Sequence, residues 1–167
     1  MAASSKADDT ASGATAPPSY NRVLVLVVDD SPADRLLISQ AFKKAGDRID
    51  LHLCSAGQDA LDYLQARPPY QDARRPSACL LDLKMPGVSG LDVLSEIKSD
   101  DRLRALPVMM FSTSNRRSDV RASYERFASG YIRKPMDVDE MDDIARTLTH
   151  LWTDLLEIPA GENEHPH

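Results

Sequence analysis

This sequence of 167 residues has few cysteines, no long apolar run and no excess of positive charge. Its two cysteines, Cys54 and Cys79, stand inside apolar runs without the spacing of metal ligands, so we expect buried free thiols. Lysine and arginine number 20 against 26 acidic residues, and the resulting net charge of −6 disfavours binding to nucleic acid or to an anionic membrane. Without an apolar leader or a membrane-length apolar run, we expect a cytoplasmic protein.

The two ends of the chain differ in composition from its middle. Residues 1–19 are mostly small, polar or proline residues, which predicts a disordered arm, and residues 159–167 are expected to form a disordered tail. The remaining residues, 20–158, are enough for one domain with its own hydrophobic core.

Within that domain, apolar strands alternate with helical patterns. Arg22–Val28 reads as a two-sided apolar strand of the kind found inside parallel sheets, and Ser31-Pro32 then begins a helix that ends at Gly46. Later strands are expected at Ile49–Cys54, in the run ending on Asp82, at Pro107–Phe111 and at Gly130–Arg133, with helices at Gly57–Ala66, Ser89–Lys98, Arg116–Ala128 and Asp137–Glu157. This alternation predicts an α/β fold with a parallel sheet covered by helices on both faces.

Polar residues follow the strands where each one ends. Asp29 and Asp30 follow the first strand, Asp82 the third, Ser112 the fourth and Lys134 the fifth. Parallel strands bring these residues to one edge of the sheet, the edge where ligands bind in open α/β sheets. Such a cluster of carboxylates needs a cation or shifted pKa values, and its oxygen donors suit Mg²⁺. A carboxylate beside Mg²⁺ can attack a phosphoryl group, so we expect an aspartyl phosphate on Asp82.

The order of these motifs resembles that of response-regulator receiver domains of two-component signalling. The resemblance covers about Arg22 to Leu156 and rests on Asp29-Asp30, Asp82, Ser112 and Gly130-Tyr131-Ile132-Arg133-Lys134-Pro135. It implies the flavodoxin-like (βα)5 fold, a doubly wound parallel sheet with strand order 2-1-3-4-5.

The resemblance also implies a role for each matching residue. Asp82 would be the phosphoacceptor and Lys134 the phosphate-sensing ammonium. Asp30, Asp82 and the backbone carbonyl of Lys84 would hold Mg²⁺, with Asp29 acting largely through water. Ser112 would be the switch hydroxyl and Tyr131 the switch aromatic. The family further implies a cis peptide bond between Lys134 and Pro135.

More narrowly, Ser31-Pro32-Ala33-Asp34-Arg35, the Arg- and Pro-rich loop before the third strand, Ile97-Lys98-Ser99-Asp100 and Leu151-Trp152 resemble the small regulators of bacterial phytochrome kinases. This resemblance implies a single-domain response regulator that receives its phosphoryl group from a sensor histidine kinase, with a bacteriophytochrome as candidate. Its chemistry would be limited to its own phosphorylation and dephosphorylation, so it would not be an enzyme. Signalling would use phosphorylation-dependent protein contacts.

Lys84 and Ser114 depart from the best-known single-domain members and bear on the lifetime of the phosphoryl group. Both side chains should border the path of the attacking water. Lys84 would pair with the phosphate and shield it, whereas Ser114 offers no carboxylate to orient a water. We therefore expect slow self-dephosphorylation. The alternative is that Lys84 merely points to solvent.

The last predicted helix carries a broad apolar stripe that includes Trp152, Leu155 and Leu156. About twenty residues of helix are longer than a five-residue strand, so the distal part should overhang the sheet and expose apolar surface. We expect a homodimer formed through the fourth helix, the fifth strand and the fifth helix. The alternative is that the stripe is entirely intramolecular core.

Two other functions remain open from the sequence. One is a small Mg²⁺-dependent phosphohydrolase, although Lys84 stands where such enzymes generally place a second aspartate. The other is a constitutive adaptor that is never phosphorylated, which the complete set of site residues disfavours.

Overall fold

The computed structural model describes residues 22–158, and the predicted terminal segments 1–19 and 159–167 lie outside the described residues. Five parallel strands form one sheet in the order β2-β1-β3-β4-β5, which confirms the predicted fold class and strand order. The strands are β1 (Val23–Val28), β2 (Ile49–Cys54), β3 (Ala78–Leu81), β4 (Val108–Ser112) and β5 (Gly130–Arg133).

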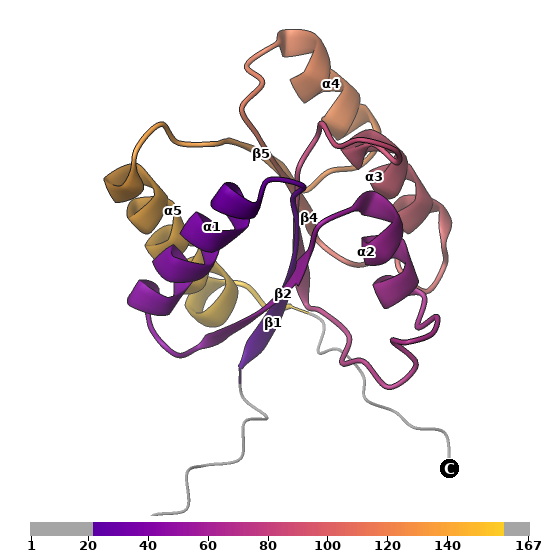
Figure 1. Cartoon of the computed structure of the whole chain (residues 1–167), viewed down its shortest axis with the longest axis horizontal. Helices are drawn as coiled ribbons and strands as arrows, with labels where there is room; N and C mark the ends of the chain where they lie inside the picture. Colours follow the sequence, from indigo (N-terminus) through magenta and orange to yellow (C-terminus); the bar gives the residue numbers. More distant parts are fainter. Residues whose placement is uncertain (1–21, 159–167) are drawn as a thin grey trace, which may run out of the picture.

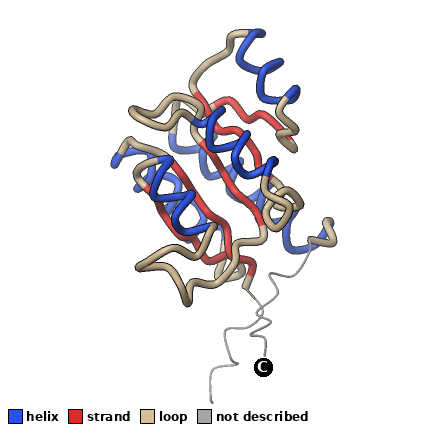
Figure 2. Tube along the Cα trace, turned by 90° about the vertical axis from the view of Figure 1, so that its right-hand side faces the viewer, coloured by secondary structure: helices blue, strands red, loops and turns tan. Residues whose placement is uncertain are grey.

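Helices cover both faces of the sheet (Figure 1). They are α1 (Pro32–Ala45), α2 (Gly57–Leu64), α3 (Gly90–Ser99), α4 (Arg117–Glu125) and α5 (Val138–His150), with a π-helical turn η2 (Leu151–Leu155) after α5. α1 and α5 lie side by side on one face, and α2 and α3 on the other. Figure 2 shows the strands running between these helical layers. None of the helices among residues 22–158 is both long and apolar enough to span a membrane.

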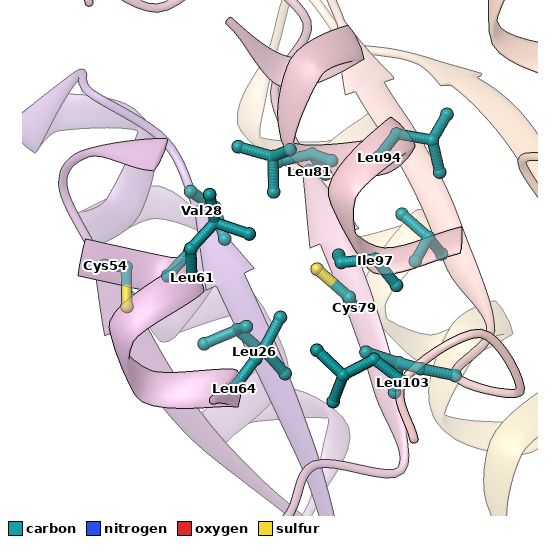
Figure 3. Close-up of a cluster of buried hydrophobic side chains, with 14 of the residues drawn as sticks. Leu26, Val28, Cys54, Leu61, Leu64, Cys79, Leu81, Leu94, Ile97 and Leu103 are labelled. Carbon is teal, nitrogen blue, oxygen red and sulfur yellow. The ribbon is translucent and has the colours of Figure 1, made fainter. Parts of the chain in front are cut away.

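The two faces of the sheet belong to two separate hydrophobic cores. Because side chains alternate along a strand, Leu26 and Val28 of β1 point toward α2 and α3, whereas Val25 and Val27 point toward α1 and α5. Figure 3 shows the first of these cores, where Leu26 lies near Leu64 of α2 and Cys79 of β3 lies near Ile97 of α3. Cys54 and Cys79 are buried free thiols in the same core, as predicted.

The register of the strands fixes where their carboxyl ends lie. Val28 of β1 pairs with Leu81 of β3, and Leu81 pairs with Met110 of β4. The residues that follow these strands therefore emerge beside one another at one edge of the sheet.

The end of the chain differs from the prediction. α5 stops at His150 instead of continuing to Glu157, and the backbone widens into η2. Trp152 was expected to overhang the sheet, but only 3% of its surface is exposed, because it packs into the core beside α1. Leu155 and Leu156 remain exposed, as predicted.

Two further expectations are corrected. The fourth helix ends at Glu125 rather than Ala128, because Phe127 adopts a left-handed backbone conformation with φ of 67°. Within residues 22–158 the cis peptide bond joins Pro68 to Pro69, so the Lys134-Pro135 bond is not cis.

Candidate functional site

Three carboxylates gather at the carboxyl edge of the sheet. Asp29 and Asp30 follow β1 and Asp82 follows β3, and each offers an oxygen within 4.8 Å of the others. Asp29 and Asp82 are buried, whereas Asp30 is exposed and opens the cluster to solvent. The sequence prediction that these three residues meet is correct.

The surroundings of Asp82 disfavour its ionised form. Burial raises the pKa of Asp82 to about 6, and the negative charges of Asp29 and Asp30 add to this effect while Lys134 opposes it. A cation placed among the three carboxylates would relieve the repulsion.

The donor set of the cluster fits a hard divalent cation. Asp29 Oδ1 accepts a hydrogen bond from the Ser31 amide at 2.9 Å, but its Oδ2 is buried without a hydrogen-bond partner of good geometry. A buried carboxylate oxygen beside two further carboxylates, one of them open to water, suits Mg²⁺, which takes oxygen ligands and keeps several waters.

Lys134 lies within reach of several carboxylates. Its Nζ is 2.7 Å from Asp29 Oδ2 and 3.3 Å from Asp82 Oδ2, and 8% of its side-chain surface is exposed. Burial lowers the pKa of Lys134, but the neighbouring carboxylates outweigh burial and leave the pKa above its usual range. The backbone also holds this residue in place, because the Lys134 amide donates to the Ser112 carbonyl at 2.8 Å. Lys134 is therefore a fixed positive charge beside Asp82.

A further residue of the site was not predicted. Asp34, in the first turn of α1, accepts a hydrogen bond from Lys134 Nζ at 2.8 Å. Asp34 belongs to the motif Ser31-Pro32-Ala33-Asp34-Arg35, which resembles the phytochrome-kinase regulators but implies no role for it at the site. The capping-box spacing Ser31-x-x-Asp34 places Asp34 in the first turn of the helix after β1, but it does not indicate a contact with Lys134.

Ser112 and Tyr131 are linked through the loop after β4. The buried Ser112 Oγ accepts a hydrogen bond from the Ser114 amide at 3.2 Å, and the Tyr131 hydroxyl donates to the Ser114 carbonyl at 2.9 Å. Ser114 Oγ in turn donates to Asp119 near the start of α4. Ser114 therefore connects Ser112 to both Tyr131 and α4.

Gly90, at the start of α3, holds the loop after Asp82 in place. The Gly90 amide donates to the Leu83 carbonyl at 2.9 Å, and a Cβ on Gly90 would stand 1.9 Å from the carbonyl oxygen of Asp82. Only glycine fits this close approach, so Gly90 sets the position of the Asp82 backbone.

The Lys84 side chain is exposed and makes no ion pair with any of residues 22–158.

The geometry gathers what a carboxylate needs to act as a nucleophile toward a phosphoryl group. Asp82 is the candidate nucleophile, Asp29 and Asp30 can help to hold a cation beside it, and Lys134 can neutralise developing charge on phosphoryl oxygens.

Comparisons with known proteins agree with this arrangement. Residues 25–146 match the family model described as the response regulator receiver domain. The response regulator Rcp1 of Synechocystis is 31% identical over 138 residues, which cover 83% of this chain and 94% of Rcp1.

Solved structures agree as well. The phosphorylated cyanobacterial phytochrome response regulator RcpA is 31% identical with a TM-score of 0.79, over 83% of this chain and 99% of RcpA. The Mn²⁺-bound form of Rcp1 is 31% identical with a TM-score of 0.77, over the same share of each chain.

Proposed function

This chain belongs to the response regulator receiver domain family and is related to the phytochrome response regulators, and we propose that it accepts a phosphoryl group on Asp82 from a sensor histidine kinase. The observation that carries this proposal is the placement of the Lys134 ammonium 3.3 Å from Asp82 Oδ2, in a cluster with Asp29 and Asp30. The phosphorylated state of the related RcpA supports it.

The cofactor is proposed to be Mg²⁺, held by Asp30, Asp82 and the backbone carbonyl of Lys84, with Asp29 acting through water. When bound, it would neutralise the carboxylates and the incoming phosphoryl oxygens. The three carboxylate oxygens within 4.8 Å of one another and the Mn²⁺-bound form of Rcp1 support this assignment.

In the proposed transfer, a carboxylate oxygen of Asp82 attacks the phosphorus of a kinase phosphohistidine. The oxygen–phosphorus bond forms as the phosphorus–nitrogen bond breaks, and the imidazole leaves with the electron pair. Lys134 then pairs with a phosphoryl oxygen, and the Ser112 hydroxyl turns to donate to another. The Ser112 contact with the Ser114 amide is lost in that turn, so the loop that holds Tyr131 and α4 shifts, and a protein partner can read the change.

The phosphoryl group is proposed to be long-lived. Ser114 has no carboxylate to orient an attacking water, and its hydroxyl is engaged by Asp119. Lys84 is exposed and free to turn toward phosphoryl oxygens at the mouth of the site.

The proposed partners are a sensor histidine kinase, with a bacteriophytochrome as candidate, and a second copy of the chain. A homodimer through α4, β5 and α5 is supported by exposed apolar side chains on both sides of β5, where Phe127 and Met136 are 75% and 91% exposed. Leu155 and Leu156 remain candidates for this interface, whereas the buried Trp152 is withdrawn from it. We propose a cytoplasmic signalling role, with no chemistry beyond the protein's own phosphorylation and dephosphorylation.

The test is incubation with Mg²⁺ and acetyl phosphate, followed by intact-mass analysis of the wild type and Asp82→Asn. We expect one added phosphate on the wild type and none on the variant. If neither protein gains an adduct and the donor is not consumed, the chain is a constitutive adaptor. Consumption of the donor without any adduct would indicate the phosphohydrolase.

A further inference from the structure

The Lys134 ammonium lies closer to Asp34 than to the acceptor Asp82. Nζ donates to Asp34 Oδ2 at 2.8 Å, whereas it lies 3.3 Å from Asp82 Oδ2. We propose that Asp34 is a positioning residue that holds Lys134 in the resting state and releases it when Asp82 is phosphorylated. This inference rests on the proposed function.

The start of α1 leaves the Asp34 carboxylate free for this contact. In a capping box, the acidic residue three positions after the N-cap accepts the backbone N–H of the N-cap residue. Here that N–H, on Ser31, donates to Asp29 Oδ1 instead, while the Ser31 hydroxyl still caps α1 by accepting from the Asp34 amide at 3.2 Å. The Asp34 side chain therefore turns to Lys134.

The first turn of α1 is also fixed relative to the acceptor edge. Arg35 donates from its guanidinium to the Asp29 carbonyl at 2.7 Å. Asp34 thus reaches Lys134 from a backbone held on both sides, so the contact does not require α1 to move.

The exposed fraction of each carboxylate side chain determines which of them can release Lys134. The Asp29 side chain is 2% exposed, so water cannot replace Lys134 there, whereas the Asp34 side chain is 35% exposed and can be rehydrated. A phosphoryl group on Asp82 adds negative charge close to the Lys134 ammonium, which lies 3.3 Å from Asp82 Oδ2. Lys134 therefore moves toward the phosphoryl oxygens, and Asp34 turns to solvent.

The resting contact competes with the phosphoryl group, so removing it should tighten binding of a phosphoryl analogue. We would titrate the wild type, Asp34→Asn and Asp34→Glu with beryllofluoride in the presence of Mg²⁺, and follow both the affinity and the NMR signal of the Lys134 ammonium. The matched control is Asp142→Asn, which removes an α5 carboxylate that pairs with Lys44 of α1 at 3.0 Å.

We expect Asp34→Asn to bind beryllofluoride about threefold to fivefold more tightly, in line with the strength of a partly exposed ion pair. Asp34→Glu should return the affinity toward wild type, and Asp142→Asn should equal wild type. The Lys134 ammonium signal should shift on binding in the wild type and should already be displaced in free Asp34→Asn.

A folded Asp34→Asn with unchanged or weaker affinity, or with an unchanged ammonium signal, would overturn the role of Asp34 alone. Failure of the wild type to bind beryllofluoride would overturn the proposed function, and this inference with it.

Discussion

Trp152 stacks on Phe42, with ring centroids 6.3 Å apart and ring planes inclined by 9°, and this contact joins η2 to α1. Both rings are buried in the core that α1 and α5 share. We predict that Phe42→Ala lowers the free energy of unfolding by about 3 kcal/mol, because a buried aromatic ring is lost and a cavity remains.

Urea unfolding followed by fluorescence measures this effect directly, since Trp152 is the single tryptophan of the sequence. The control is Leu155→Ala, which removes a side chain that is 63% exposed and should change stability by less than about 0.5 kcal/mol. Equal stability of Phe42→Ala and wild type would contradict the contact.

The raised pKa of Asp82 predicts that ionisation of this residue lowers the stability of the metal-free protein. Because the pKa is about 6 in the folded state and about 4 in the unfolded chain, the folded protein binds more protons between these values. The contribution of Asp82 to stability therefore falls as the pH rises from about 4 to 6 and stays lost above that window.

Asp82→Asn should consequently be more stable than wild type by about 1 to 2 kcal/mol at pH 7.5 in chelator, a value reduced from the full shift for partial solvation. At pH 5 the difference should shrink. Denaturant curves of both proteins at the two pH values test this, and a difference that does not depend on pH would argue against ionised Asp82 as its source.

The lifetime of the phosphoryl group should depend on Ser114. We expect the phosphorylated wild type to lose its phosphate over minutes or longer, because Ser114 offers no carboxylate to orient an attacking water. Ser114→Glu supplies one and should shorten the half-life by about tenfold, less than the roughly hundredfold effect of a well-placed general base.

Intact-mass sampling after removal of acetyl phosphate gives the half-lives, and Ser114→Ala controls for loss of the hydrogen bond to Asp119. A half-life of seconds for the wild type would refute slow turnover.

The proposed homodimer predicts a concentration-dependent mass. Light scattering at micromolar concentration should give a dimer for the wild type, and Leu155→Arg should shift it toward the monomer, because a charge at an apolar interface is poorly solvated. Leu36→Arg is the matched control, since Leu36 is exposed on α1 and lies outside the proposed interface. A monomeric wild type would contradict the proposal that the exposed apolar residues beside β5 form a dimer interface.

Residues that follow strands could be placed from the sequence, whereas contacts made by long side chains could not. Asp29, Asp82 and Lys134 were predicted to meet because parallel strands bring their ends to one edge, and that rule depends only on strand order. The contact between Asp34 and Lys134 depends on which acceptor takes the Ser31 amide, and the sequence does not determine that choice.

The error at Trp152 has a different physical origin. A straight α-helix from Asp137 to Glu157 would project beyond the sheet, but the backbone widens after His150 and brings the indole back onto α1. The apolar stripe was correctly identified from its helical spacing. That spacing does not reveal that the backbone leaves the α-helical path after His150.

The sheet also separates the two cores, since none of residues 22–158 belongs to both. A substitution among the side chains on the α1 and α5 face can reach the opposite face only through the backbone of a strand. Gly90, which supports Asp82, belongs to α3 on that opposite face. Substitutions at the buried side chains that α1 and α5 share should therefore leave the Gly90 support beneath Asp82 unchanged.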